Sequence, residues 1–140
     1  NKQIDLSAYV KDLNGRLKLD FTFNTANSME INLSNKEGNK LLVGYDAAAK
    51  IYYIDRSNSG EVTFEKGFGK KHIATRIAKS TNAKFSLILD AASAELFADN
   101  GLTVLTDIFF PSRPIDGLKI TGTGKQVLSN LEISAIPSSR

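Results

Sequence analysis

The dominant period of hydrophobic residues along the chain is two, which is the period of a β-strand with one buried face. The clearest case is residues 17–23, where two leucines and two phenylalanines alternate with polar residues. The pattern predicts about ten strands of ordinary length. The apolar positions that define the clearest of them are Leu17, Leu19, Phe21, Phe23, Met29, Ile31, Leu33, Leu41, Val43, Tyr45, Phe85, Leu87, Leu89, Leu118, Ile120, Leu131 and Ile133.

Turn-forming residues separate these segments. Three dipeptides, Asn14-Gly15, Asn100-Gly101 and Asp116-Gly117, predict tight two-residue hairpins. Residues 36–39 and 57–60 predict slightly longer loops, because both segments combine glycine with polar residues. The order of strands and turns therefore favours antiparallel pairing of neighbours.

Two alanine-rich segments, residues 46–49 and 91–94, are too short for helices and lie between strands, so we interpret them as turns. Pro111 and Pro114 interrupt any strand in their region. No repeat or linker is visible, so residues 1–140 are expected to form a single domain. Antiparallel strands with one apolar face need a second sheet to cover it, which predicts an all-β, two-sheet, jelly-roll-like β-sandwich. A closed barrel is the alternative.

Composition narrows the chemistry. The chain has 140 residues, 41% of them hydrophobic and 24% charged, which is typical of a globular domain. It contains no cysteine, no tryptophan and one histidine, His72. A disulfide scaffold, a cysteine nucleophile, a thiolate metal site and a multi-histidine metal centre are therefore excluded. The phosphate-binding glycine loop and the serine-nucleophile motif are also absent, and we predict no metal and no cofactor.

The net charge of +3 does not by itself indicate a nucleic-acid partner. The one dense basic patch is Lys66, Lys70, Lys71 and His72, which we interpret as part of a solvated, glycine-rich loop. We expect no nucleic-acid partner, and no membrane association because no apolar run approaches the roughly 20 residues of a bilayer span. The opening Asn-Lys-Gln-Ile suggests a piece of a longer protein.

Residues 51–57 form a strand that ends in an acid and a base. Adjacent side chains on a strand point to opposite faces, so Asp55 shares a face with Tyr53, and Arg56 shares one with Tyr52. Such a strand can supply a polar pocket with an aromatic wall. The alternative is a surface ion pair that closes a hairpin.

Glu95 projects from the middle of a second strand, just before a turn. A carboxylate accepts two hydroxyl hydrogen bonds, which suits a sugar, although a solvated glutamate is the simpler interpretation. His72 and Arg76 share a face of a third segment, and Arg76 could pair with Asp55 or Glu95. The two carboxylates also raise the possibility of glycoside hydrolysis, which uses such a pair.

Two segments resemble a known family. Residues 85–90 followed by Ala94-Glu95-Leu96-Phe97-Ala98-Asp99-Asn100-Gly101 and Val104-Leu105-Thr106 are similar to a signature of the C-terminal β-sandwich of glycoside hydrolase family 32, the invertases, inulinases and levanases. Residues 53–60 resemble a second signature of the same sandwich. Asp55, Arg56 and Glu95 occupy motif positions. Asp90 also does, but it opens a turn, and Ala91-Ala92 replaces an arginine-serine pair.

The resemblance implies a noncatalytic module, similar to carbohydrate-binding module family 66, that holds the terminal fructose of levan or another β-fructan for an attached exo-levanase. The catalytic propeller motifs of that family do not occur here, so the chain itself is not expected to be an enzyme. We expect a secreted, extracellular, monomeric domain whose partners are fructan and the parent's catalytic domain. The expected ligand-binding residues are Asp55, Arg56, Glu95, Arg76, Tyr53, Tyr52 and His72.

Three other functions stay open on the sequence. A purely structural sandwich would support a fructan-hydrolase propeller without binding sugar and would expose an apolar patch. A small hydrolase would use Asp55 and Glu95. A basic nucleic-acid binder is the weakest of the three, and its binding would depend steeply on salt.

Overall fold

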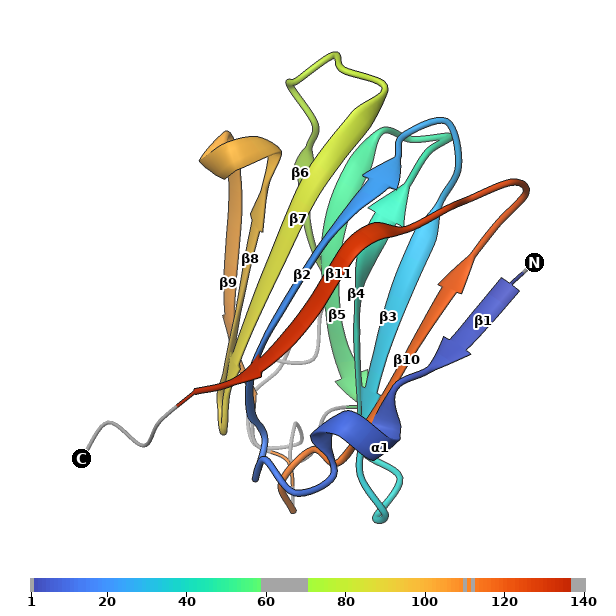
Figure 1. Cartoon of the computed structure of the whole chain (residues 1–140). Coiled ribbons are helices and arrows are strands. Elements are labelled where there is room, and N and C mark those ends of the chain that lie inside the picture. Colours follow the sequence, from blue (N-terminus) through green and yellow to red (C-terminus); the bar gives the residue numbers. More distant parts are fainter. Residues whose placement is uncertain (1, 59–70, 110, 112, 137–140) are drawn as a thin grey trace.

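The computed structural model describes residues 2–58, 71–109, 111 and 113–136. Its elements are almost entirely β-strands (Figure 1). In chain order they are β1 (Lys2–Asp5), α1 (Ser7–Val10), β2 (Arg16–Asn24), β3 (Met29–Ser34), β4 (Lys40–Asp46), β5 (Ile51–Asn58), β6 (Lys71–Thr75), β7 (Asn82–Asp90), β8 (Ser93–Ala98), the single turn η1 (Asp99–Gly101), β9 (Thr103–Ile108), β10 (Gly117–Gly122) and β11 (Ser129–Ala135).

These strands form two antiparallel sheets that pack face to face, which confirms the predicted all-β sandwich. We name the six-stranded sheet, in the order β1-β10-β3-β4-β5-β6, sheet A, and the five-stranded sheet, in the order β11-β2-β7-β8-β9, sheet B. At one side of the sandwich the edge strands β6 and β9 approach each other. At the other side lie β1 with α1 and the edge strand β11 (Figure 1).

The alternation in the sequence matches the faces of the strands. In β2 the residues at 17, 19, 21 and 23 are buried between the sheets, while the residues between them lie on the outer face. β2 pairs along its whole length with β7, from Arg16 opposite Asp90 to Asn24 opposite Asn82. This ladder is the longest in the molecule's described part, and it forms the centre of sheet B.

Aromatic rings fill the middle of the core. Phe21 and Phe85, opposite each other in sheet B, stack with ring centroids 5.1 Å apart and planes inclined by 14°. Phe23 and Tyr52 each approach Phe85 to 6.2 Å, and Tyr52 reaches the cluster from sheet A. Edge-to-face and offset arrangements of this kind are the favourable ones for aromatic pairs. All four side chains are essentially inaccessible to solvent.

The predicted hairpins were only partly right. Asn100-Gly101 does lie in a hairpin, but the loop between β8 and β9 has four residues. Asn14-Gly15 lies after α1, a helical turn that the period-two pattern did not predict, and Asp116-Gly117 leads into β10. The hairpins predicted at these two dipeptides were wrong, because the strands before and after each dipeptide belong to different sheets.

Candidate functional site

The seven residues predicted to bind a ligand do not converge on one pocket. The prediction of which side chains share a face of β5 was right, but the two faces lie on opposite sides of sheet A. Glu95 lies on the outer face of the other sheet. Tyr52 and Arg56 point into the sandwich, His72 and Arg76 join them from the β6 side, Tyr53 and Asp55 face outward from sheet A, and Glu95 faces outward from sheet B.

Arg56 and His72 meet at a buried carboxylate. The Oδ1 atom of Asp107 lies 3.0 Å from Arg56 Nη1 and 3.0 Å from His72 Nδ1. Asp107 belongs to β9 and its side chain is only 2% exposed. Burial raises the pKa of the Asp107 carboxyl above its ordinary value, although electrostatic attraction to Arg56 and His72 acts to lower it. The cluster ties the edge of sheet A to the edge of sheet B, and we assign these contacts a structural role.

Arg76 pairs with Asp99, so the expectation of Asp55 or Glu95 as its partner was wrong. Its Nη2 and Nε atoms lie 2.9 Å and 3.0 Å from the two oxygens of Asp99. The hydroxyl of Tyr52 donates to the same carboxylate at 2.9 Å. Burial, followed by the hydrogen bond to Asp99, raises the pKa of the Tyr52 phenol. Because Tyr52 has no exposed surface, it cannot form the predicted wall against a ligand.

The β8–β9 turn explains why Asp99 reaches Arg76. Asp99, Asn100 and Gly101 all have positive φ, at 55°, 58° and 93°. Aspartate, asparagine and glycine are the residues that tolerate this left-handed conformation best. The turn sequence therefore carried a signal for an unusual backbone, but nothing in it indicated an ionic partner in the interior.

Tyr53 lies across the outer face of sheet A and is almost buried there. Its hydroxyl donates to Glu30 Oε2 at 2.5 Å, across the intervening Gly44 of β4. The ammonium of Lys71 lies 4.4 Å from the centre of the tyrosine ring. Burial and the neighbouring Glu30 carboxylate raise the pKa of the Tyr53 phenol. Sequence reasoning missed Glu30, whose alternation with apolar neighbours indicated only an outward-facing position.

Glu95 is half-buried on the outer face of sheet B, between Ile88 of β7 and Thr106 of β9. Among the described residues it has no hydrogen-bond or ion-pair partner. Two positions further along the same face, Phe97 lines a hollow of about 280 Å³. The other residues of that hollow are Lys84, Ser86, Asn100 and Gly101.

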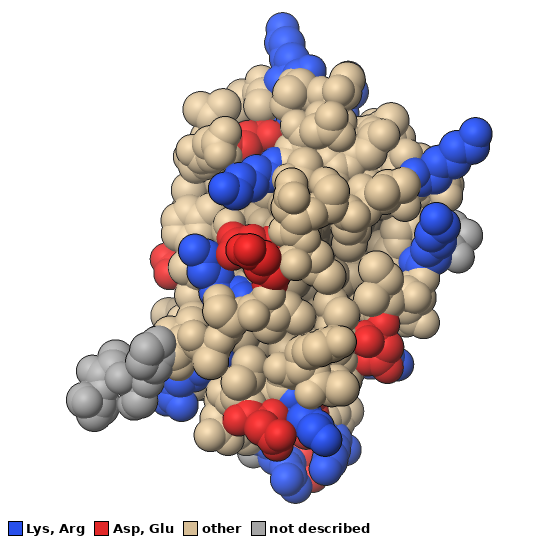
Figure 2. All heavy atoms as spheres, viewed as in Figure 1, with Lys and Arg blue, Asp and Glu red and all other residues tan. Residues whose placement is uncertain are grey.

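Charged residues are interspersed on the face of the molecule shown in Figure 2. Lysines and arginines lie near acidic residues, with broad uncharged surface between them. Within the ranges that the structure describes, no group of three or more His, Asp or Glu side chains is placed to hold a metal ion. None of the helices in those ranges is long and apolar enough to cross a membrane. Lys66 and Lys70 of the predicted basic patch lie outside the described residues.

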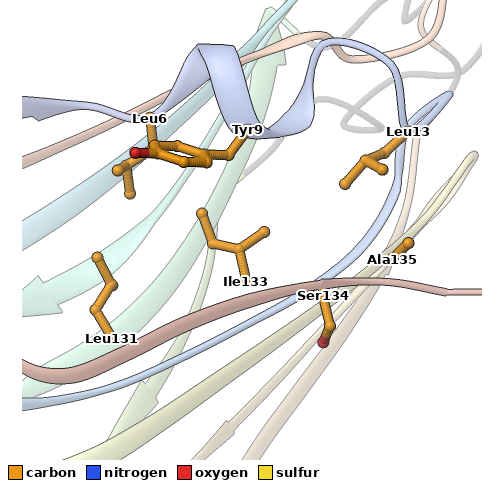
Figure 3. Close-up of a pocket in the computed structure, with 7 residues that line it drawn as sticks. All are labelled: Leu6, Tyr9, Leu13, Leu131, Ile133, Ser134 and Ala135. Atoms are coloured by element: carbon orange, nitrogen blue, oxygen red, sulfur yellow. The ribbon is translucent and has the colours of Figure 1, made fainter.

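An apolar hollow of about 500 Å³ lies between α1 and β11 (Figure 3). Leu6, Tyr9 and Leu13 approach it from the helix side, and Ile133 points toward them from β11. Tyr9 is 69% exposed, although it lines the same hollow as the leucine and isoleucine side chains. We call this surface the α1–β11 groove.

The fold places the chain in the class of two-sheet antiparallel β-sandwich domains. Within that class, residues 2–135 match the family described as the C-terminal domain of family 32 glycosyl hydrolases. The chain belongs to this family.

Individual relatives are fructan hydrolases by name. The chain is 29% identical over 136 residues to the levanase of Bacillus sp. (strain L7), covering 96% of this chain and 14% of the levanase. It is 36% identical over 84 residues to the extracellular exo-inulinase of Aspergillus awamori, covering 59% of this chain and 16% of that enzyme. The crystal structure of the Aspergillus awamori exo-inulinase superposes with a TM-score of 0.76 at 24% identity, over 95% of this chain and 25% of that one.

Proposed function

We propose that this domain is a noncatalytic accessory domain of a secreted fructan hydrolase, and that it binds the terminal fructose of a β-fructan such as levan. The names of the relatives, levanase and extracellular exo-inulinase, support the substrate class and the extracellular location. The chain spans only 14–16% of these relatives, so the hydrolytic activity would belong to the rest of the parent protein.

The observation that carries the proposal is the free carboxylate of Glu95 on the rigid outer face of sheet B. The other predicted side chains with buried polar groups have partners inside the domain, whereas Glu95 has none among the described residues. Because Glu95 is only partly buried, its oxygens can be hydrated, and a ligand must bring hydrogen-bond donors that replace this water. Adjacent hydroxyls of a fructose ring are such donors.

The hollow that begins two positions from Glu95 on the same face suits a sugar. Phe97 offers an apolar surface for the C–H groups of a furanose ring, and Lys84 and Asn100 can donate to its oxygens. A single sugar buries few atoms, so the expected dissociation constant is in the roughly micromolar to millimolar range.

The geometry disfavours a hydrolase that pairs Asp55 with Glu95. These residues face outward from different sheets, and packed sheets are themselves about 10 Å apart. The carboxyl groups of glycosidases lie within roughly 10 Å of each other on one substrate-binding surface. The absence of fructose release from levan by the purified domain would agree with this reasoning.

The test is calorimetric titration of the domain with levan, inulin and fructose, repeated for Glu95→Gln. Loss of the charged hydrogen bonds should weaken levan binding by about tenfold to a hundredfold. The matched control is Glu132→Gln, which changes an exposed glutamate at the far edge of the same sheet. Equal binding by wild type and Glu95→Gln would place the site elsewhere, and no binding by wild type would overturn the proposal.

The α1–β11 groove favours a second candidate function, in which the sandwich supports the parent's catalytic domain without binding sugar. This candidate predicts an apolar patch on the isolated domain, and the groove provides one. In the parent enzyme, Tyr9→Ser together with Ile133→Ser should then lower the unfolding temperature of the catalytic domain. The Glu95→Gln variant should leave that temperature unchanged.

A further inference from the structure

A second polar hollow, of about 370 Å³, lies on the outer face of sheet A and faces away from Glu95. Its charged and aromatic members are Glu30, Tyr45, Asp46, Tyr53 and Lys71, and its other lining residues are Ser28, Met29, Thr121 and Thr123. Thr121, Glu30, Gly44 and Tyr53 are direct neighbours across four successive strands. The hollow therefore rests on the middle of a sheet, where backbone positions are held by hydrogen-bonded strands on both sides.

Gly44 accounts for the shape of the hollow. A Cβ atom at this position would lie 2.8 Å from the Tyr53 hydroxyl oxygen and even closer to the Met29 carbonyl oxygen. The missing side chain lets the Tyr53 ring lie along the sheet and reach Glu30. The glycine thus lowers the surface at the point where polar groups of the neighbouring strands converge.

The polar groups in the hollow still offer hydrogen-bond acceptors and donors to a ligand. Glu30 uses Oε2 for Tyr53, and its other oxygen has no partner among the described residues. Asp46 uses Oδ1 for the backbone N–H groups of Ala48 and Ala49, which leaves Oδ2 without a partner in the described part of the chain. Lys71 contacts the Tyr53 ring and keeps its three N–H donors available.

We propose that this hollow is a second binding site, for one residue of a neutral, hydroxyl-rich carbohydrate. Hydroxyls of the sugar would donate to Glu30 and Asp46 and accept from Lys71. The ammonium disfavours a divalent cation, which would need six to eight oxygen ligands and no adjacent positive charge. It also offsets one of the two carboxylates, so the site suits an uncharged ligand. The use of fructan as the probe rests on the proposed function, whereas the site itself rests on the geometry.

Two sites on opposite outer faces would make the domain bivalent. One domain could then hold two chain ends of a branched polysaccharide, and removal of one site would lower the apparent affinity for the polymer more than that for a single sugar. This difference between polymer and monosaccharide is a property that a single site does not give.

The experiment is calorimetric titration with levan fragments of defined length and with fructose, using wild type, Lys71→Met, Glu95→Gln and the double variant. Lys71→Met is the main variant because Lys71 is exposed on an edge strand and its loss should not unfold the domain. The matched control is Lys119→Met, an exposed lysine on the outer face of the same sheet. Circular dichroism and thermal unfolding verify that each variant is folded.

The expected result is two sites in wild type, one in each single variant, and at least a tenfold loss of affinity in the double variant. If Lys71→Met binds like wild type while Glu95→Gln loses all binding, the second site is wrong and the proposed function stands. If Lys71→Met alone abolishes binding, the hollow is the sugar site and the Glu95 assignment falls. Binding that requires calcium, or no binding by wild type, would overturn the second site.

Discussion

The guanidinium of Arg76 binds both oxygens of the Asp99 carboxylate, at 2.9 Å and 3.0 Å, with side chains that are only 6% and 3% exposed. Removal of one partner from a buried pair leaves the other charge without compensation. Arg76→Met should therefore lower the free energy of unfolding by about 3–5 kcal/mol. Chemical denaturation measures this difference.

The control for this prediction is Arg16→Met. Arg16 forms an ion pair with Asp90 at 3.2 Å, but both side chains are well exposed, and exposed pairs contribute about 0–1 kcal/mol. Similar losses for Arg16→Met and Arg76→Met would contradict the assignment of Arg76 and Asp99 as a buried structural pair.

Phe85 is the centre of the aromatic core, since it stacks on Phe21 and also contacts Phe23 and Tyr52. Phe85→Ala should cost about 3–5 kcal/mol of unfolding free energy, because truncation leaves a cavity between two rigid sheets. Tyr9→Ala removes a ring of similar size from an exposed position and should change stability by less than about 1 kcal/mol. An equal effect of the two truncations in urea titrations would argue against this packing.

Gly44→Ala should destabilise the domain by about 1–3 kcal/mol, because the added Cβ has no room beside the Met29 carbonyl. Addition of Tyr53→Phe should not restore the loss, since the contact with the backbone persists. Gly38→Ala is the comparison. Gly38 has a φ of 85° and open space around it, so only backbone strain of about 1 kcal/mol is expected there. Thermal unfolding of the four proteins separates the crowding from the strain.

The buried carboxyl of Asp107 predicts how the stability of the domain depends on pH. Its pKa is raised by burial above the ordinary value of 3.8. As pH rises from 3.8 through the raised value, the folded protein binds more protons than the unfolded chain, so the contribution of this group to stability falls. The Asp107→Asn variant lacks this titration. The stability of wild type relative to Asp107→Asn should therefore decrease as the pH rises above about 3.8, and an increase in urea unfolding experiments would contradict the assignment.

The buried faces of the long strands could be predicted from the sequence, whereas the edge strands β1 and β6 could be predicted less well. In β2, β3 and β7 the alternation follows burial directly, because one face of each strand meets the other sheet. β1 and β6 have no fully buried side chains, and both are edge strands. A strand that buries neither face needs no alternation of hydrophobic and polar residues. The sequences of β1 and β6 therefore show only a weak pattern.

The candidate site was harder to predict for a related reason. Parity within β5 correctly separated Asp55 from Arg56, but it cannot tell which sheet contains a given strand. Asp55 and Glu95 therefore seemed able to face each other, although they belong to different sheets. The partners Asp99 and Asp107 come from β9 and the turn before it, and contacts between sheets leave no local signal in the sequence.

The long β2–β7 ladder has a consequence for the order in which the chain folds. Strands β3 to β6 are consecutive neighbours in sheet A and can pair as soon as each is synthesised. β2, by contrast, finds its central partner only after β7 has been made, as the pairing of Arg16 with Asp90 illustrates. Closing so large a loop slows folding. Until then the two leucines and two phenylalanines of β2 have no sheet of their own, so the nascent chain is most exposed to aggregation before β7 is synthesised.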